Sequence, residues 1–551
     1  MVNGDRAWLR QYPPDIDPAP RVSHASIVDA WRTRVSVNPE RAAIRYFDGS
    51  ISARQLDGHS DALAVELQAR GIRPGDRVGV YLQNIPHYPL ALLAIWKAGA
   101  IVVPLNPMYR RGELRRLIDD SGTTGVILAN GSDVETRETL AGSDVRWLLS
   151  ASSRDFQQRD DPRAFEHGDG APSPDGEVAA ILAARSGERP EPAPRTLADI
   201  AFITYTSGTT GPPKGALNTH GNFLNSVMNY GNWLRLSPGD VVFAIAPLFH
   251  ITGLSLNAGI ALLHDATLSM ADRFQPAVTL DAFVEHGVTT TVGSITAFNA
   301  FFQLPDAGPE HFASAKLLYS GGAPIPPATI EKFRSRFGHY IHNIWGMTET
   351  TAAGIAVPPG AQAPVHDGSG TLSVGVPMQN VDAWVIDEAG EPQSPGVEGE
   401  LVFAAPQVIP GYWRNPEASE RTLPGGNLHT GDVAVIDDDG WVYLVDRIKD
   451  LINTSGFKVW PREVEDALYE HPAVFEAAVI GVPDDYRGEA VAGYVSLRPG
   501  PLVSPEELIE FVRDRLAAYK CPRQIHVVDV LPKTATGKIQ RGQLRARHTG
   551  R

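Results

Sequence analysis

The segment Thr204–Gly215 reads TYTSGTTGPPKG and follows an apolar run that ends at Ile203. It holds five Ser/Thr residues, three glycines, two prolines and one lysine in twelve positions. A simple β-hairpin needs only a two-residue turn, whereas a phosphate-binding loop needs many backbone N–H groups, several hydroxyls and a cation. Taken alone, the segment is compatible with a hairpin, an anion-binding loop or a plain linker.

The side chains of this segment suit a bound phosphate. Its glycines let the backbone approach a ligand closely, two prolines stiffen it, and Lys214 supplies positive charge. Hydroxyls able to donate to phosphate oxygens come from Thr206, Ser207, Thr209 and Thr210. The segment lacks the G-x-x-x-x-G-K-[ST] spacing, which disfavours a P-loop nucleotide hydrolase.

Bulk composition predicts a globular protein of several domains. A chain of 551 residues is too long for one core, and 43% hydrophobic and 21% charged residues are ordinary values for a globular protein. The net charge of −15 disfavours nonspecific nucleic-acid binding, which needs clustered Lys and Arg.

Several features predict a cytoplasmic location. The single cysteine, Cys521, excludes an intrachain disulfide, and the N-terminus lacks an apolar signal core. The most apolar stretch, Tyr88–Leu105, carries Lys97 near its middle and prolines near both ends. We therefore expect a buried helix followed by a strand there, with no transmembrane segment.

The apolar pattern changes twice along the chain. The first part alternates helices and apolar strands, which predicts a parallel sheet covered on both faces; one helix would start at the N-cap Ser52. From Val374, short alternating strands with Gly/Pro turns are typical of an antiparallel sheet or barrel. The last hundred residues resemble a separate α+β domain, with Pro461 opening one helix and a capping box at Ser504 opening another.

The opening segment resembles the phosphate-binding signature of the adenylate-forming superfamily, which includes acyl- and aryl-CoA synthetases, nonribosomal-peptide adenylation domains and beetle luciferases. Six further signatures occur in the superfamily's order: APLFHITG from Ala246, SGGAP from Ser320, WGMTET from Trp345, LHTGD from Leu428, DRIKDLINTSGFKVWPREVE from Asp446 and PKTATGKIQR from Pro532. The resemblance covers about residues 25–545 and favours the acyl- or aryl-CoA ligase branch.

This resemblance implies an α/β fold. The large N-terminal adenylation domain would span 1–446 and contain two βαβ-type subdomains and a small distorted β-barrel at about 355–445. A small mobile α+β domain would span 447–551.

It also implies a two-step reaction with ATP, Mg²⁺ and coenzyme A. A carboxylate attacks the α-phosphate of ATP, and a thiol then displaces AMP from the acyl-adenylate. The first step brings two anions together, so it needs Mg²⁺ and cationic donors where charge develops.

The resemblance assigns the nucleotide site residue by residue. Trp345 would stack on adenine, Asn343 would bond its edge, Asp432 would bind the ribose and Arg447 would reach ribose or phosphate. The remaining nucleotide contacts would be Thr206, Ser207, Gly208, Thr209, Thr210, Lys214, Gly322, Ala323, Pro324, Gly346, Thr348 and Lys538. A core tryptophan and a surface ion pair are the simpler alternatives for Trp345 and for Asp432 with Arg447.

Catalysis and metal binding fall on a smaller set. Glu349 and Thr206 would hold Mg²⁺, and Thr348 would bond the α-phosphate. Lys538 would bridge the carboxylate and the α-phosphate, although a C-terminal basic segment is more often a solvated helix. The assigned catalytic residues are Lys538, Thr348, Arg447 and His250.

The second step would require the small domain to rotate. Lys449 stands at the superfamily's hinge position, where other branches carry Asp. The segment that would then contact coenzyme A comprises Ser455, Gly456, Phe457 and Lys458.

The acid pocket would be lined by His250, Gly293, Ser294, Ala297, Gly321, Gly346 and Met347. A neutral His250, where amino-acid-selecting relatives carry Asp, favours an acid without an amino group: hydrophobic, fatty, aromatic or bulky. Small residues would leave volume for it: Gly293, Ser294, Ala297, Ala352, Ala353 and Gly354.

Other functions stay open from sequence alone. An acyl-AMP ligase would load a carrier-protein thiol instead of coenzyme A, and a luciferase-like oxygenase would share only adenylation. A non-catalytic nucleotide-binding regulator is disfavoured by the intact assigned residues. The oligomeric state, including a homodimer, also stays open.

Overall fold

The structure is a computed structural model of the 551-residue chain. It describes residues 6–165, 177–206, 213–323, 325–367, 370–447, 450–454, 457–484, 487–498, 500, 503–534 and 538–548. Within these ranges, five side chains are not described: Asp133, Asp446, Arg447, Phe457 and Lys458.

A six-stranded sheet forms one half of the large N-terminal unit. Its order is β6-β5-β3-β4-β7-β8, parallel up to β7, with β8 antiparallel at the edge. The strands are β3 (Arg77–Tyr81), β4 (Ile101–Pro104), β5 (Gly125–Ala129), β6 (Trp147–Ala151), β7 (Ile200–Thr206) and β8 (Lys214–Thr219).

A nine-stranded sheet forms the other half. Its order is β15-β14-β13-β12-β11-β9-β10-β1-β2, and the six strands from β13 to β1 run parallel. The strands are β1 (Ala42–Tyr46), β2 (Gly49–Ser52), β9 (Val241–Phe243), β10 (Thr267–Met270), β11 (Thr290–Gly293), β12 (Leu317–Gly321), β13 (Ile341–Met347), β14 (Ala352–Ala356) and β15 (Val376–Pro377).

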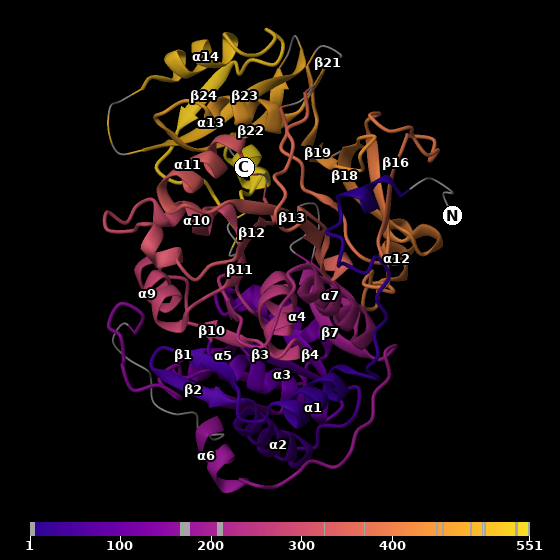
Figure 1. Cartoon of the computed structure of the whole chain (residues 1–551), viewed down its shortest axis with the longest axis vertical. Coiled ribbons are helices and arrows are strands. Elements are labelled where there is room, and N and C mark those ends of the chain that lie inside the picture. Colours follow the sequence, from indigo (N-terminus) through magenta and orange to yellow (C-terminus); the bar gives the residue numbers. More distant parts are fainter. Residues whose placement is uncertain are drawn as a thin grey trace.

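Helices pack on both sheets, as parallel strands require (Figure 1). The large unit contains α1 (Ile27–Val37), α2 (Ala53–Ala69), α3 (His87–Lys97), α4 (Arg111–Ser121), α5 (Asp133–Leu140), α6 (Val178–Ala184), α7 (His220–Trp233), α8 (Ile260–Leu263), α9 (Pro276–His286), α10 (Ile295–Phe301), α11 (Pro327–Phe337), α12 (Pro416–Thr422) and short turns η1 (Ala7–Gln11), η3 (Pro309–Phe312), η4 (Thr348–Thr350) and η5 (Pro424–Gly426). Ser52 caps α2 as predicted, in a capping box with Gln55.

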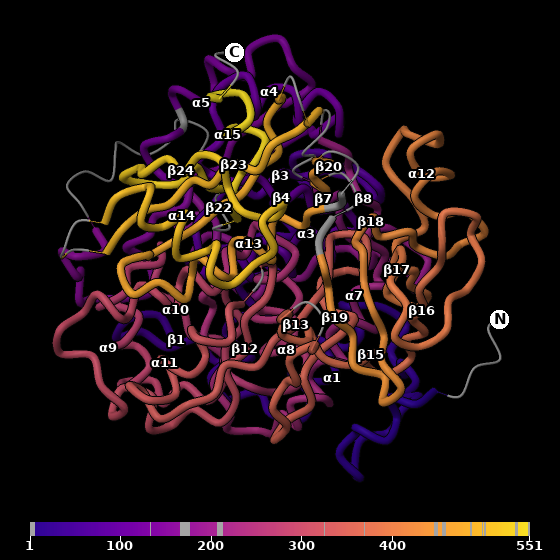
Figure 2. The backbone as a smooth tube through the Cα atoms, turned by 90° about the horizontal axis from the view of Figure 1, so that it is seen from above, coloured from indigo at the N-terminus to yellow at the C-terminus, as the bar shows by residue number. Residues whose placement is uncertain are grey.

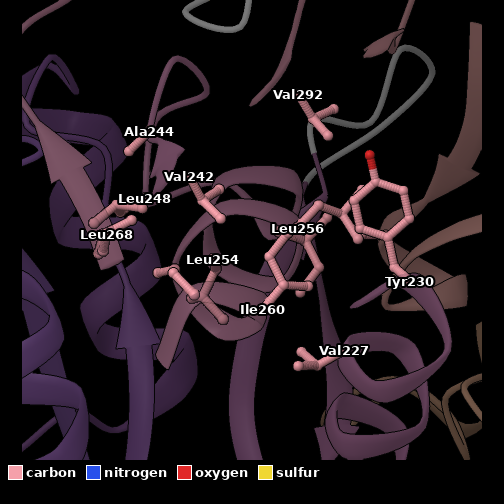
Figure 3. Packing of buried hydrophobic residues seen from close by; sticks show 14 of the residues in the cluster. Val227, Tyr230, Val242, Ala244, Leu248, Leu254, Leu256, Ile260, Leu268 and Val292 are labelled. Carbon is pink, nitrogen blue, oxygen red and sulfur yellow. The ribbon is translucent and has the colours of Figure 1, made fainter. Parts of the chain in front are cut away.

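A π-helix, η2 (Gly253–Gly259), leads into α8 behind the centre of the nine-stranded sheet. Its residues are all buried, and the view in Figure 3 shows Leu254 and Leu256 packed among residues of the neighbouring strands and of α7, including Val242 and Val227. π-Helices widen the helical turn and often occur at functional sites. This one follows His250, a predicted site residue.

The third sheet is antiparallel and lies beside the two large ones (Figures 1 and 2). It comprises β16 (Asp382–Ile386), β17 (Gly399–Ala404), β18 (Leu428–Ile436) and β19 (Val442–Arg447), in that order. β14 and β15 pair with the nine-stranded sheet instead. The antiparallel sheet therefore spans 382–447: it begins later than the predicted barrel region, about 355–445, and extends two residues past its end.

The C-terminal unit has its own cores on two faces of a five-stranded sheet. Its elements are β20 (Ile452–Thr454), β21 (Phe457–Val459), α13 (Pro461–Tyr469), β22 (Val474–Asp484), β23 (Gly488–Leu497), α14 (Pro505–Arg513), β24 (Gln524–Val527) and α15 (Arg541–His548). Pro461 opens α13, and the capping box at Ser504 opens α14, as predicted. Separate cores make this an independent unit.

The C-terminal unit lies against one end of the large unit, next to α10 and α11 (Figures 1 and 2). A pocket between them is lined by Asn299 and Phe302 on one side and by Tyr469 and Phe475 on the other. These observations confirm the predicted fold class. No described helix has both the length and the apolarity that crossing a membrane requires.

Lys97 sits at the end of the fully buried helix α3 and explains why a charge interrupts the most apolar stretch of the chain. Its ammonium contacts Asp57 Oδ1 at 2.6 Å, Asp61 Oδ1 at 2.7 Å and Ser60 Oγ at 2.9 Å, all on α2. The buried cation is thus fully paired and ties α3 to α2.

We expect Lys97→Met to destabilise the large unit by about 3–5 kcal/mol, because it leaves two carboxylates partly buried without their cation. Urea unfolding followed by tryptophan fluorescence measures this. Arg421→Met, which removes one member of an exposed pair with Glu417, is the control and should change stability by less than about 0.5 kcal/mol. Equal effects of the two changes would contradict a structural role for the Lys97 cluster.

Candidate active site

The opening segment lies at the end of a β-hairpin. β7 and β8 pair antiparallel from Ile200↔Thr219 to Thr206↔Lys214, and the Thr206 hydroxyl donates to the Lys214 carbonyl at 3.4 Å. The hairpin and loop alternatives are therefore not exclusive, because a hairpin presents the loop. Ser207, Gly208, Thr209 and Thr210 lie outside the described residues.

The turn η4, which carries Thr348 and Glu349, lies against this hairpin. Asn218 of β8 donates its amide to the Thr348 carbonyl at 3.2 Å and to the Thr351 hydroxyl at 3.0 Å. The chain reverses at once, with Thr351 at φ 49° and Ala352 at φ 94°. These contacts hold the predicted metal and α-phosphate residues beside the two strands that flank the predicted phosphate loop.

Backbone segments approach each other closely at the carboxyl ends of the central strands. A Cβ on Gly346 would overlap the carbonyl oxygen of Ala352, and one on Gly321 would lie 2.5 Å from the carbonyl oxygen of Ile344. Gly322 follows at φ 81°, in the left-handed region that favours glycine. Ligands of open α/β sheets bind at this edge.

Glu349 is buried and hydrogen-bonded to Tyr412. The Tyr412 hydroxyl donates to Glu349 Oε1 at 2.5 Å, and the Lys214 ammonium lies 4.3 Å from the centre of the Tyr412 ring. Burial and the negative charge of Glu349 raise the pKa of Tyr412 well above its usual value. The phenol is therefore a hydrogen-bond donor at neutral pH.

These residues fit a magnesium ion whose coordination shell is completed mainly by the phosphate oxygens of a bound substrate and by water. Mg²⁺ often takes one or two protein carboxylates and completes its shell with waters and phosphate oxygens. The described residues contain no cluster of three or more His, Cys, Asp or Glu side chains that could hold a metal by themselves. Glu349, with one oxygen occupied by a phenol, matches the single-carboxylate pattern.

The predicted adenine and ribose residues meet across two sheets. Trp345 on β13 donates its indole N–H to Asp432 Oδ2 on β18 at 3.0 Å. Asn343 donates to the Ser373 carbonyl at 3.1 Å, which leaves its second N–H and its oxygen for a ligand. Arg447 pairs with Asp432 through the backbone of β19.

Lys538 reaches the site from the C-terminal unit. Thr534 N–H donates to the Lys538 carbonyl at 2.7 Å, and Lys538 N–H donates to the Thr534 hydroxyl at 3.1 Å, so two hydrogen bonds fix Lys538 to Thr534. Its Cε would lie 3.2 Å from a Cβ on Gly322, so the side chain packs on that glycine. Its charge also acts on His250. The structure thus has the lysine inside the site.

His250 is held as a neutral ring. Thr252 N–H donates to His250 Nδ1 at 3.3 Å, which leaves the proton on Nε2. Burial, together with the nearby positive charge of Lys538, lowers the pKa of His250 to about 3. The side chain therefore offers a neutral N–H or a π-face to a ligand.

The predicted acid-pocket residues share the carboxyl edge of the nine-stranded sheet. Ser294 caps α10 by accepting from Ala297 N–H, and Met347 is half-buried. The prediction that small residues leave volume for the acid is wrong at two positions: a Cβ on Gly293 would overlap the Ile245 side chain, and one on Gly354 would overlap the Phe403 ring. Neighbouring side chains occupy the space beside these two glycines, so the glycines do not enlarge the predicted acid pocket.

Several predicted residues lie outside what the structure describes. They are Pro324, the hinge residue Lys449, and Ser455 and Gly456; the side chains of Arg447, Phe457 and Lys458 are also undescribed. Their assignments stay predictions.

Sequence reasoning missed Asn218 and Tyr412, which hold the backbone and side chain of the η4 turn. It also missed a cluster in the C-terminal unit, where Arg541 pairs with Glu465 at 2.8 Å and with Asp450 at 3.2 Å. Because these contacts join distant segments, local spacing carried no signal for them.

The comparisons with known proteins cover most of the chain. Residues 31–413 match the family model of the AMP-binding enzymes, and residues 463–538 match that of the AMP-binding enzyme C-terminal domain. A feruloyl-CoA synthase from Amycolatopsis is 34% identical over 514 residues, 93% of this chain and 97% of that protein. A long-chain-fatty-acid–CoA ligase from Escherichia coli O157:H7 is 32% identical over 574 aligned positions, 99% of each chain.

Solved structures show the same architecture. An anthranilate CoA ligase, AuaEII, in complex with anthranoyl-AMP superposes with a TM-score of 0.86 at 26% identity. The match covers 96% of this chain and 98% of that one.

We expect the ring of His250 to stay uncharged between pH 5 and 8, because its pKa lies below this range. Histidine ring signals, assigned by comparison with a His250→Asn variant, measure this in a pH titration by NMR. In Lys538→Ala the pKa should rise only in part, since burial remains. A midpoint near 6.5 in the wild type would contradict the position of this ring, largely shielded from solvent and close to Lys538.

Proposed function

The chain belongs to the AMP-binding enzyme family and is an AMP-forming acyl-CoA synthetase, and we propose that its acid substrate is hydrophobic and lacks an amino group. Fatty, aromatic and bulky carboxylic acids meet this description. The proposal rests on the neutral ring of His250 at the carboxyl edge of the nine-stranded sheet. Lys538, which packs on Gly322, lies close enough to lower the pKa of that ring.

In the first step, a carboxylate oxygen of the acid bonds to the α-phosphorus of ATP, and the bond to the β-phosphate oxygen breaks with release of pyrophosphate. We infer that Lys538 lies between the two anions and lowers their repulsion as the bond forms. Thr348, half-exposed beside the hairpin, is suited to donate to an α-phosphate oxygen. Lys214 would meet the outer phosphates.

We infer that Glu349, with Thr206 from the hairpin, holds Mg²⁺ bound with ATP. The ion would neutralise phosphate charge and so favour departure of pyrophosphate. Trp345 and Asp432 would bind adenosine, and the indole N–H would orient the carboxylate toward the ribose hydroxyls.

The neutral ring of His250 supports an uncharged acyl group. An ammonium group would need an anionic partner, and a buried uncompensated charge is costly. The names of the relatives, which act on feruloyl and long-chain fatty acyl groups, agree with an apolar substrate.

In the second step, the sulfur of coenzyme A bonds to the acyl carbon and AMP leaves. Lys538 must first withdraw, and the separate cores of the C-terminal unit allow it to move as one body. We propose Lys449 as the pivot and Ser455–Lys458 as the segment that then faces the thiol. Cys521 is a free, buried thiol, and free thiols persist in reducing compartments. We therefore propose that the enzyme acts in the cytoplasm.

Pyrophosphate release with MgATP, measured across fatty, aryl and polycyclic acids with and without coenzyme A, tests the proposal. Release with an apolar acid, together with thioester that depends on coenzyme A, is the expected result. Release only with amino acids would overturn the substrate class. Thioester on a carrier protein but not on coenzyme A would overturn the acceptor.

We expect Lys538→Ala to abolish adenylation, by about a thousandfold or more, while leaving thioester formation from supplied acyl-AMP within about tenfold of wild type. The reason is that Lys538 acts only when the acid meets ATP. Single-turnover assays of each step measure the two rates. Lys449→Pro should show the reverse pattern, and an equal loss of both steps in folded Lys538→Ala would contradict the two-position account.

A further inference from the structure

Tyr412 joins the two sides of the proposed phosphate and metal site. It lies in a segment that no sequence motif singled out, yet it contacts both Glu349 and Lys214. We propose that Tyr412 is a positioning residue: its hydroxyl fixes the metal-binding carboxylate, and its ring holds the Lys214 ammonium over its face, apart from that carboxylate. This inference rests on the proposed function, because it assumes that Glu349 takes a divalent cation.

The hydroxyl restricts the carboxylate to one orientation. A charge-assisted O–H···O⁻ bond of 2.5 Å between buried groups is short and strong. Among the described residues, no hydrogen bond to the other oxygen, Oε2, is recorded. Oε1 is thereby committed to the phenol, and Oε2 is the oxygen that remains for a cation.

The backbone on both sides of the pair is anchored. Ile409 N–H donates to the Glu349 carbonyl at 2.9 Å, so the chain leading to Tyr412 is tied to η4. Tyr412 N–H donates to the Ser419 hydroxyl at 2.8 Å. These two hydrogen bonds anchor the backbone of Glu349 and of Tyr412, and so restrict how far the phenol and the carboxylate can move apart.

The same segment pairs with the hairpin. Leu217 N–H donates to the Gly411 carbonyl at 3.0 Å, and Trp413 N–H donates to the Gly215 carbonyl at 2.7 Å. These two hydrogen bonds lie on either side of Tyr412. Residues 411–413 therefore pair with β8 as a short additional segment of the hairpin sheet, next to Lys214. The position of Tyr412 is thus tied by main-chain bonds to the hairpin strand that begins at Lys214.

The ring gives Lys214 a position apart from the carboxylate. Its ammonium lies over the ring at 4.3 Å, and within the described part of the chain it forms no salt bridge. A cation on a π-face is stabilised without neutralising a carboxylate. Lys214 and Glu349 are thus not joined in an ion pair, which leaves the carboxylate for a metal and the ammonium for phosphate.

Tyr412 also belongs to a small apolar cluster with Ala216, Ile409 and Ala418. Packing alone would explain its burial. The two roles make different predictions, because Tyr412→Phe keeps the ring and the packing but removes the hydroxyl.

Mn²⁺ binding in the presence of α,β-methylene-ATP, followed by electron paramagnetic resonance, tests the hydroxyl without requiring turnover. We expect Tyr412→Phe to weaken Mn²⁺ binding about tenfold, with an unchanged thermal midpoint. In a Glu349→Gln background the same change should have no further effect. Tyr443→Phe is the matched control, because that phenol, on β19 and outside the proposed site, also donates to a carboxylate, Asp437, at 2.9 Å. Mn²⁺ affinity within twofold of wild type in Tyr412→Phe would overturn the proposal.

Tyr412→Leu tests the ring. It should raise the KM for ATP several-fold beyond Tyr412→Phe, and this extra effect should vanish in a Lys214→Met background. Persistence of the extra effect there would overturn the role of the ring. Absence of pyrophosphate release by wild type with every acid would count against the proposed function, whereas the Mn²⁺ measurement still decides the role of the hydroxyl.

Discussion

The close contact of two backbone segments at Gly346 is the constraint on which the site depends. The carbonyl of Ala352 occupies the space where any other residue would carry its Cβ. This contact folds β14 back on β13 and sets the turn that carries Thr348 and Glu349. The neighbouring strand repeats the arrangement at Gly321, beside the glycine on which Lys538 packs. The carboxyl edge of the sheet is therefore shaped by main chain, which is rigid, and the side chains that approach it take fixed positions.

In this site, the charged side chains are kept apart from one another and do not form salt bridges among the described residues. Glu349 is bonded by a neutral phenol, Lys214 lies on a ring face, and His250 is uncharged in the presence of Lys538. A buried salt bridge between Lys214 and Glu349 would cancel the charges that the proposed site offers to ATP and a divalent cation. Elsewhere in the molecule, where no ligand is expected, buried charges pair directly: Lys97 contacts two aspartates.

The division into two units follows from the location of the cores. The faces of the C-terminal sheet are filled by residues of that unit alone. Lys538, the proposed catalytic lysine, thus belongs to a unit with cores of its own, and its proposed withdrawal would leave the core of the large unit intact. A reaction in which the lysine serves one step and obstructs the next requires this independence.

The sequence by itself determined the family, the class of reaction and the main local elements. These features are local patterns, which can be recognised without knowledge of the fold. They include the opening loop, the signatures at Trp345 and Lys538, and the helix starts at Ser52, Pro461 and Ser504. It did not reveal Tyr412, and it misjudged Gly293 and Gly354, whose space is filled by side chains from distant segments. Only the tertiary structure decided these points, because such contacts arise when strands far apart in the chain meet at one edge of a sheet.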